Sequence, residues 1–429
     1  MSNNSKSDFF DFLRKISIPF LLIPPKKYVL RRIYYVLVVP HFTLLGLIPV
    51  SELIEITIVG TGNFSTDMLV FGILMMHSMG LMRLLASFIL QNRHEPIVTS
   101  IRKWRLDIRL FSYSNLLNIS KRKLAVSINR HPISKYKEDK MEEAKRLCVK
   151  LFMYLLFYVI LNISMTYTLN YQRPVYEKFN GRLNRTSLYR DYAYSLYYPF
   201  DTSISDGYYL IGFVYQPYSF FFLMSSFMCV HMFGVGSCIY LKCKADITGY
   251  AFKYVDRNID YKQCYKDVIM LKKIRIVNCI NELQDIYECA YHVNKVVSIQ
   301  MLFQMFFVGM ILCSVAYRVE SVKSAGELFY LTSMAGVSLL ICYFACWYSQ
   351  EFTLQVGDIS NRIQDLDWLS YPHSLRKTLV FLMMRLQKPF WFTLAEWTPS
   401  DTGAVFVLVK TSYSFYTLIK NTGSTIKTG

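Results

Sequence analysis

Seven long apolar stretches constrain the fold of this chain more than any motif in it. They occupy residues 33–50, 68–90, 148–169, 208–241, 296–317, 328–349 and about 402–419. A helix needs about 20 apolar residues to cross the hydrocarbon core of a bilayer. Most of these stretches are apolar on every face, whereas a surface helix of a soluble protein has one apolar stripe. The sequence predicts an all-α polytopic membrane protein with seven transmembrane helices.

The placement of basic residues predicts its orientation. The chain has a formal net charge of +18 and contains 48 Lys and Arg. Of these, 37 fall in 1–32, 91–150, 242–295 and 350–398, and nine fall in the alternate segments 51–67, 170–207, 318–327 and 420–429. Basic loops are retained in the cytoplasm. We therefore expect an inverted topology, with the N-terminus inside and the C-terminus outside. The charge is explained by topology, and no nucleic acid partner is expected.

The segments predicted to lie outside carry two glycosylation sequons. These are at Asn63 and Asn184, and both fit the orientation. No cysteine falls in these segments, so we expect no external disulfide. Cys342 and Cys346 share a helix face but have no further ligand nearby, and no metal site is expected.

The chain divides into membrane and cytoplasmic regions. Basic segments lie between spans two and three and between spans four and five, and the second of them mixes charge with apolar residues at helical spacing. This pattern predicts long cytoplasmic helices, and the amphipathic stretch "LRKTLVFLMMRL" offers them a packing partner. "TPSDTG" then breaks the chain, with Ser400 or Asp401 as the expected N-cap of the last helix. The expected regions are a cytoplasmic N-terminal segment (1–32), helices one to four with a ligand pocket (33–241), a cytoplasmic helical extension (242–295), helices five and six (296–349), cytoplasmic helices (350–398) and the seventh helix with an external C-terminus (399–429).

Catalytic motifs are missing from the sequence. It contains no HExxH, GxSxG, Walker loop or GxGxxG, and we expect neither an enzyme nor a cofactor. His41, His77 and His231 are each alone in a span, where hydrogen-bonded packing is the commoner role. Arg83 lies towards the cytoplasmic end of the second span. We expect it to reach the interface or to pair with a cytoplasmic acid, and a gating role is the alternative.

Aromatic and methionine residues recur at similar depth in four spans. Together with a few polar groups they could line an apolar pocket for a small hydrophobic ligand, and simple helix packing is the alternative. The candidate residues are Phe71, Leu74, Met75, Tyr158, Asn162, Met165, Tyr209, Phe213, Phe329, Tyr330, Ser333 and Met334.

The last apolar segment has polar groups that lipid cannot satisfy. Positions spaced by three and four place hydroxyls, rings and one amine along one stripe: Val409, Ser412, Tyr413, Tyr416, Thr417 and Lys420. One such stripe per subunit around a symmetry axis would line a pore. The alternative is a helix buried within its own bundle.

The closing third of the chain resembles the insect odorant receptor family. The resemblance rests on Trp368, "LRK" at 375–377, "RLQKP" at 385–389 and "KTSYSFYTL" at 410–418, together with the seven-span plan. The related gustatory receptors typically end in a Thr-Tyr, apolar run, Gln-Phe pattern. This chain has "TLIKN" there, which favours the odorant branch.

The resemblance implies a ligand-gated, non-selective cation channel that assembles as a tetramer with a shared co-receptor. It implies a volatile organic ligand and a place in the plasma membrane of olfactory neuron dendrites, with lipid around the subunit. By position, Tyr416 lies near the pore constriction, and the residues of the intersubunit anchor are Trp368, Arg376, Arg385 and Pro389. The segment between spans four and five is short for a co-receptor, which suggests a ligand-tuning subunit. Lys420 departs from expectation, because a ring of ammonium groups would repel cations unless it points away.

Two rivals come from other classes of membrane protein. A G-protein-coupled receptor would have its N-terminus outside, against the charge bias, and the DRY and NPxxY patterns are missing. A secondary transporter would show repeat halves and midplane charges. A gustatory-receptor-like channel remains the nearest alternative within the same architecture.

Overall fold

The computed structural model describes residue 9, residues 28–59, 64–89, 132–171, 176–180, 185–189, residue 192, and residues 196–200, 206–257, 265–322 and 324–428. Asn63 and Asn184, the two expected glycosylation sites, lie outside the described residues. The predicted cytoplasmic segment 1–32 and the stretch 91–131 are also almost wholly outside them.

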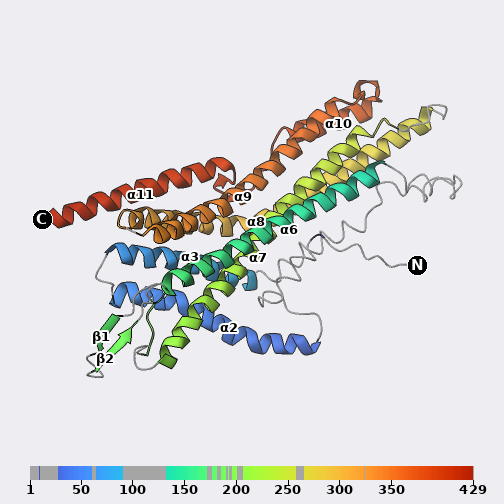
Figure 1. Ribbon diagram of the computed structural model, residues 1–429. Helices are drawn as coiled ribbons and strands as arrows, with labels where there is room; N and C mark the ends of the chain where they lie inside the picture. The colour runs from blue at the N-terminus through green and yellow to red at the C-terminus, as the bar shows by residue number, and fades with distance from the viewer. Residues whose placement is uncertain are drawn as a thin grey trace.

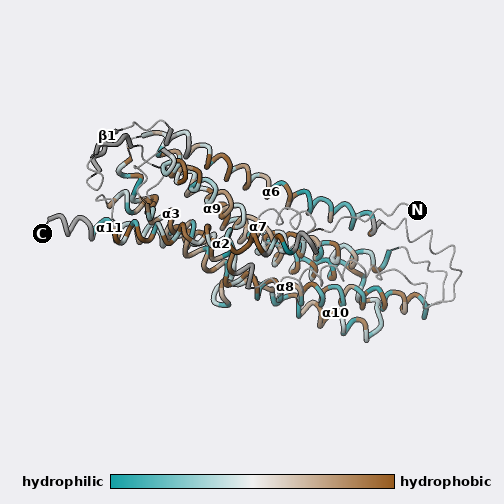
Figure 2. Tube along the Cα trace, turned by 90° about the horizontal axis from the view of Figure 1, so that it is seen from below, coloured by the Kyte–Doolittle hydropathy of each residue, from teal (hydrophilic) through white to brown (hydrophobic). Residues whose placement is uncertain are grey.

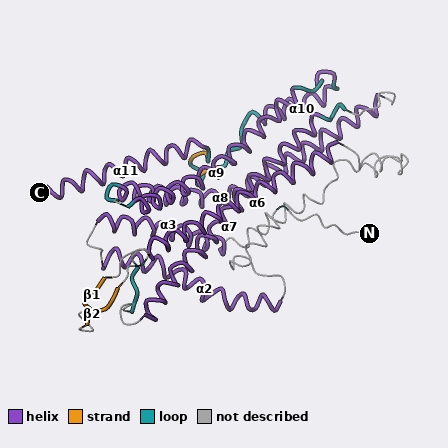
Figure 3. Tube along the Cα trace, viewed as in Figure 1, coloured by secondary structure: helices purple, strands orange, loops and turns teal. Residues whose placement is uncertain are grey.

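Helices make up nearly all of the described structure (Figures 1 and 3). In chain order the elements are α2 (Tyr28–Ile54), η1 (Glu55–Val59), α3 (Phe64–Ile89), α6 (Pro132–Tyr171), β1 (Tyr176–Asn180), β2 (Arg185–Tyr189), α7 (Asp206–Lys253), α8 (Tyr265–Val319), α9 (Ala325–Gln364), η4 (Trp368–Ser370), α10 (His373–Leu386), β3 (Thr393–Leu394), β4 (Thr398–Pro399) and α11 (Thr402–Thr428). The strands form two antiparallel hairpins, β1–β2 and β3–β4.

The two ends of the bundle differ. Figure 1 shows α10 and the start of α8 at one end, and the β1–β2 hairpin and the C-terminus at the other. Figure 2 shows the same polarity along α6, which is hydrophilic at its N-terminal end and hydrophobic further along. The sequence explains this pattern, because "SKYKEDKMEEAKR" precedes the apolar run of that helix.

Seven long helices contain the seven predicted apolar stretches, which confirms the all-α polytopic fold. Six of the described helices are long and apolar enough to cross a membrane by length and composition. The seventh, α11, falls short of that measure because Lys410, Lys420 and a series of hydroxyl groups interrupt its apolar residues.

Helix α7 is the centre of the bundle. It packs against α9, α6, α3 and α8, and most of its apolar span is buried. The crossing with α3 is close at Gly80, where an added Cβ would come within 2.8 Å of Leu223 Cγ. Small residues allow backbones to approach in membranes, where packing replaces the hydrophobic effect between helices. A larger side chain at Gly80 would force these two helices apart.

The segments expected to be cytoplasmic continue the spans without a break. Helix α8 runs for 55 residues, about 83 Å at 1.5 Å per residue, so it is far longer than a bilayer. Helices α7 and α9 likewise pass through the expected limits at 241 and 349. The limits 242, 296 and 350 therefore fall inside continuous helices, where only the surrounding medium can change.

Two of the three intramembrane histidines have polar partners from another helix. His41 Nδ1 lies 2.8 Å from the Tyr218 hydroxyl, which connects α2 to α7. His77 Nδ1 lies 2.7 Å from Glu52 Oε1, and both side chains are fully buried between α2 and α3. Hydrogen-bonded packing, expected for lone histidines, describes these two.

Arg83 corrects the sequence interpretation. Its side chain neither reaches an interface nor pairs with an acid within the described part of the chain: it is 2% exposed and donates to Gln304 of α8. Its guanidinium also lies 5.0 Å from the centre of the Phe227 ring. Neighbouring helices bury the Arg83 side chain. Its position along the span, which is all that the sequence provides, does not predict this burial.

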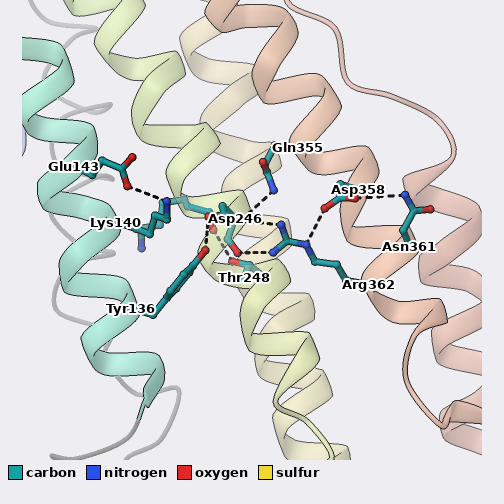
Figure 4. A network of polar contacts seen from close by, with 10 residues as sticks. Tyr136, Lys140, Glu143, Asp246, Thr248, Gln355, Asp358, Asn361 and Arg362 are labelled. Carbon is teal, nitrogen blue, oxygen red and sulfur yellow. Dashed lines mark hydrogen bonds and ion pairs between the residues drawn. The ribbon is translucent and has the colours of Figure 1, made fainter.

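A polar network joins α6, α7 and α9 beyond the apolar core (Figure 4). Asp246 of α7 accepts hydrogen bonds from the Tyr136 hydroxyl of α6 at 2.7 Å and from Arg362 Nη2 of α9 at 2.9 Å. Arg362 Nε also donates to Asp358 at 2.8 Å, and Gln355 donates to Asp246 at 3.3 Å. One carboxylate therefore holds three helices in register.

We predict that Asp246→Ala lowers the free energy of unfolding by about 1–3 kcal/mol, because it leaves partners on two helices unsatisfied. Thermal unfolding of the purified chain in detergent measures the change. The matched control is Glu142→Ala. Glu142 pairs with Arg146 at 2.9 Å on the exposed face of α6, so its loss should cost less than about 0.5 kcal/mol. Equal shifts for the two variants would contradict the role given to Asp246.

Candidate functional site

The interior part of the predicted pocket is formed by α3, α6 and α9. The Tyr158 hydroxyl of α6 lies beside the side chains of Asn162 and Ser333, but it is buried without a well-formed hydrogen bond. Ser333 directs its own hydroxyl to the Tyr330 carbonyl at 2.7 Å. Residues from two predicted spans therefore meet around an unsatisfied hydroxyl, which a polar ligand atom could satisfy.

Four apolar members of the set, on α3 and α9, are buried or partly buried. Leu74 and Met334 are buried, and Met75 and Tyr330 pack against the same hydrophobic core as Met334. The Met334 Cε atom lies 3.7 Å from where a Cβ on Gly72 would stand, so α9 closely approaches α3 here. Flexible methionine side chains suit a site that has to accept different small ligands.

Tyr209 and Phe213 belong to a different cluster, at the start of α7. The Tyr209 ring stacks on Tyr192, with centroids 5.0 Å apart, and on Phe213 at 6.1 Å. Tyr198 also contacts Tyr192 and donates to the Gly212 carbonyl at 3.3 Å. The structure thus places these two predicted pocket residues beneath the segment that precedes α7.

The sequence interpretation missed that segment as part of the site. Leu196 packs against Ile73 of α3, so residues 196–200 cover the ends of α3 and α7. The aromatic run "YRDYAYSLYYPF" at 189–200 was the available signal. Among the remaining predicted residues, Phe71 and Met165 are partly buried, and Phe329 is 52% exposed on the outside of the subunit.

Helix α11 is only thinly covered. Val405, Leu408 and Ser412 face the bundle at a spacing of three and four, and the helix packs on α8 and α9. Gly309 of α8 permits this contact, because a Cβ there would lie 3.2 Å from Leu408 Cδ1 and 3.4 Å from Ser412 Oγ. Asp401 Oδ1 caps the helix by accepting from the Ala404 amide at 3.0 Å, as the sequence suggested.

Ser412 is a correction to the expected pore stripe. It is 5% exposed and donates to the Leu408 carbonyl at 2.8 Å, so it faces α8. Val409 and Tyr413 are 43% and 65% exposed. At 100° per residue, Val409, Tyr413, Thr417 and Lys420 lie on the face next to Ser412. The polar stripe exists, but its centre is rotated away from Ser412.

The C-terminal half of α11 is tied to the turn after α8. Glu320 accepts from both the Tyr416 hydroxyl and the Lys420 amine, and Lys420 Nζ lies 3.3 Å from the Tyr416 oxygen. We call this contact the Glu320 latch. Hydrogen bonding to Lys420 lowers the pKa of Glu320, and the same contact raises the pKa of Lys420. Lys420 is thus directed at a carboxylate of its own chain, which lessens the expected conflict with passing cations.

The expected anchor residues lie on or near α10. Arg385 stands 4.7 Å from the centre of the Tyr287 ring of α8 and donates to the Lys388 carbonyl at 3.2 Å. Trp368 packs against the core from η4, Arg376 is partly buried with an unpartnered Nε, and Pro389 is exposed. Leu375, Leu379, Met383 and Leu386 form the buried face of α10, and the opposite face exposes Val380, Phe381 and Met384.

The sequence did not predict the hydrogen bonds that hold the segment between α10 and α11 against α8 and α9. Asn294 of α8 bonds Thr393 twice, donating to its hydroxyl at 3.1 Å and accepting from its amide at 2.9 Å. Gln350 of α9 accepts from the amide and the hydroxyl of Thr402 at 3.2 and 2.9 Å. The N-terminal end of α11 and the hairpin before it are therefore fixed to α8 and α9.

These features define a polytopic helical membrane protein with an interior polar site and a thinly covered polar helix. Residues 96–413 match the family model described as 7tm Odorant receptor. The chain belongs to the odorant receptor family. Membership of a receptor family agrees with the expectation that it is not an enzyme.

Individual relatives are distant. Odorant receptor 94a of Drosophila melanogaster is 23% identical over 163 residues, which are 37% of this chain and 42% of that receptor. Odorant receptor Or2 of Anopheles gambiae is 21% identical over 142 residues, covering 33% of this chain and 38% of that receptor. The matched regions thus span about two fifths of these curated relatives.

The fold is similar to a solved insect receptor over nearly its whole length. The olfactory receptor OR5 from Machilis hrabei superposes with a TM-score of 0.71 at 14% identity, covering 96% of this chain and 99% of that one. The structure of OR5 in complex with eugenol gives a TM-score of 0.72 at 12% identity, with 97% and 100% covered.

We predict that Glu320→Gln and Lys420→Gln each shift the ligand concentration–response curve in the same direction, and that the double variant adds no further shift. Residues acting through one contact are not additive. The readout is whole-cell current. Independent, additive shifts would contradict a shared latch.

The latch has a defined pH range. The lowered pKa of Glu320 keeps the contact intact at neutral pH, and it is lost as the pH falls through that value. The raised pKa of Lys420 removes it only when the pH rises above that value. Acidification should therefore reproduce the Glu320→Gln shift in the unmodified chain and leave the variant unchanged.

Proposed function

We propose that this chain is the ligand-tuning subunit of an odorant-gated, non-selective cation channel that opens a central pore. The observation that carries the proposal is the surface of α11. Phe406, Val407, Tyr413, Phe415 and Leu418 are each more than half exposed, on a helix that also presents hydroxyls and two amines. Lipid can cover the apolar side of such a helix, but its polar side needs water or another subunit.

Assembly around a symmetry axis supplies both. Four copies of a helix like α11 would place Val409, Tyr413, Thr417 and Lys420 towards a shared pore, and apolar rings can close such a pore by excluding water. The exposed apolar face of α10, next to the expected anchor residues, is suited to contact between subunits. We propose that Arg376, Arg385, Trp368 and Pro389 act there, with a shared co-receptor as the usual neighbour.

The ligand site belongs among α3, α6 and α9. The unsatisfied Tyr158 hydroxyl, with Asn162 and Ser333 beside it, supports a ligand that has one polar atom on an apolar body. OR5 has been solved with eugenol, which has this character. We propose Leu74, Met75, Tyr330 and Met334 as the apolar wall, and Tyr209 and Phe213 as contacts nearer the entrance.

The orientation follows from charge. The excess of basic residues at the end of the bundle that contains α10 supports a cytoplasmic N-terminus and an external C-terminus. The continuous helices α7, α8 and α9 then extend into the cytoplasm from 242, up to 295 and from 350. The plasma membrane of olfactory neuron dendrites is the proposed location.

The decisive experiment is voltage clamp on cells expressing the chain with and without an insect co-receptor, during exposure to terpenoid, ester and aromatic volatiles. A fast cation current that needs both subunits and survives block of G-protein signalling is the expected result. A response that requires G proteins would replace the channel by a coupled receptor. Silence from a chain whose surface expression is verified would contradict the channel function.

We predict that pocket and pore variants separate. Tyr330→Ala and Met75→Ala should change the ranking of ligands and leave ion permeability unaltered, because we place these residues in the pocket and not on α11. Tyr416→Ala should alter permeation or basal leak.

Tyr158→Phe is the sharpest pocket test, since it removes one hydroxyl and no volume. It should weaken ligands that carry a polar atom by about tenfold and leave hydrocarbon ligands unchanged. Permeability changes in the pocket variants together with altered ranking in Tyr416→Ala would refute the placement.

A further inference from the structure

Arg83 is a buried charge for which the described chain supplies no counter-ion. Its described partners are Gln304 Oε1, the Met301 sulfur at 3.9 Å and the face of the Phe227 ring. The carboxylate of Glu52 is already bonded to His77. Removing an unpaired charge from water is strongly unfavourable, so sites that hold one generally hold its opposite as well.

The groups around Arg83 present an excess of donors. Arg83 Nε–H is buried without a partner, and so is the amide nitrogen of Gln300, one turn before Gln304 on α8. His231 of α7 stacks on Phe227 with ring centres 5.8 Å apart, and its Nδ1 is buried and unpartnered as well. This nitrogen is a donor in the tautomer that carries the ring proton on Nδ1, which is the tautomer the site requires. Arg83, Gln300, Gln304 and His231 are each at most 2% exposed.

The unpartnered donors of Arg83 on α3, His231 on α7 and Gln300 on α8 all lack a hydrogen-bond acceptor. Gln304 cannot supply it, because its oxygen already accepts from Arg83 and its nitrogen points to the Cys342 sulfur at 3.5 Å. A water molecule could accept these hydrogen bonds but would leave the charge uncompensated. A small monovalent anion would accept from the donors and cancel the charge at once.

We propose that Arg83, Gln300 and His231 form a buried site for a small monovalent anion, a halide or a small carboxylate, where α3, α7 and α8 meet. Chloride is the occupant in physiological salt. The anion ties these three helices together within the membrane, away from the residues assigned to the ligand pocket. The site does not depend on the channel function proposed above.

Thermal unfolding of the full chain, purified in detergent, tests the site. The anion is varied at constant ionic strength among chloride, bromide, formate, gluconate and sulfate. The midpoint temperature should rise with chloride or bromide concentration and reach a plateau, as linkage requires for a bound ligand, and gluconate should have no such effect. A rise with formate alone would make a small carboxylate the occupant.

Variants separate a bound anion from a general salt effect. Arg83→Gln should abolish the halide-dependent rise, and Gln300→Leu, which keeps the charge and removes one donor, should raise the half-saturating concentration about tenfold. The matched control is Arg318→Gln, since Arg318 already pairs with Glu327 at 2.7 Å outside the cluster. The control should keep the halide dependence.

Three results would overturn the proposal. They are the lack of any rise with chloride, bromide or formate in the unmodified chain, an equal rise with sulfate, and an unchanged half-saturating anion concentration in Gln300→Leu. The Gln300→Leu measurement also tests the site if Arg83→Gln does not fold.

Discussion

Hydrocarbon offers no hydrogen-bond partner, and every feature of this protein follows from that constraint. It forces the backbone into helices that satisfy themselves, and it leaves each polar side chain to find a partner inside the protein. His41 bonds Tyr218 and Glu52 bonds His77, so these polar contacts fix α2 to α7 and α3. Where the described residues leave a polar group incompletely paired, at the Tyr158 hydroxyl, the Arg83 guanidinium and the exposed face of α11, we look for a ligand, an ion or another subunit.

The same constraint separates the two ends of the molecule. In the membrane the helices associate through close packing, as at Gly80, because lipid tails are as apolar as leucine. Beyond it, water allows a charged junction, and Asp246 links α6, α7 and α9 through Tyr136 and Arg362. The continuous helices connect these regions, and the hydrogen bonds of Asn294 and Gln350 connect α8 and α9 to the segment that leads into α11.

Helix α11 shows how a weak attachment can serve a moving part. Its contact with α8 is a narrow seam of Val405, Leu408 and Ser412, closed at the outer end by the Glu320 latch. A helix with few buried contacts needs little free energy to change position. That property fits an element whose two positions would open and close a pore.

The sequence alone determined the seven long helices, the amphipathic α10 and the family, because these depend on local hydrophobicity and on motifs that are continuous in the chain. It also placed Tyr158, Asn162 and Ser333 in one group, since polar residues at equal depth in neighbouring spans tend to meet inside the bundle. Only the tertiary structure decided that Ser412 faces α8, that Phe329 faces outward and that Arg83 is buried with no acid among its described neighbours. Helical periodicity gives the spacing of a stripe but not its rotation about the helix axis, and that rotation is fixed by which neighbour the helix packs against.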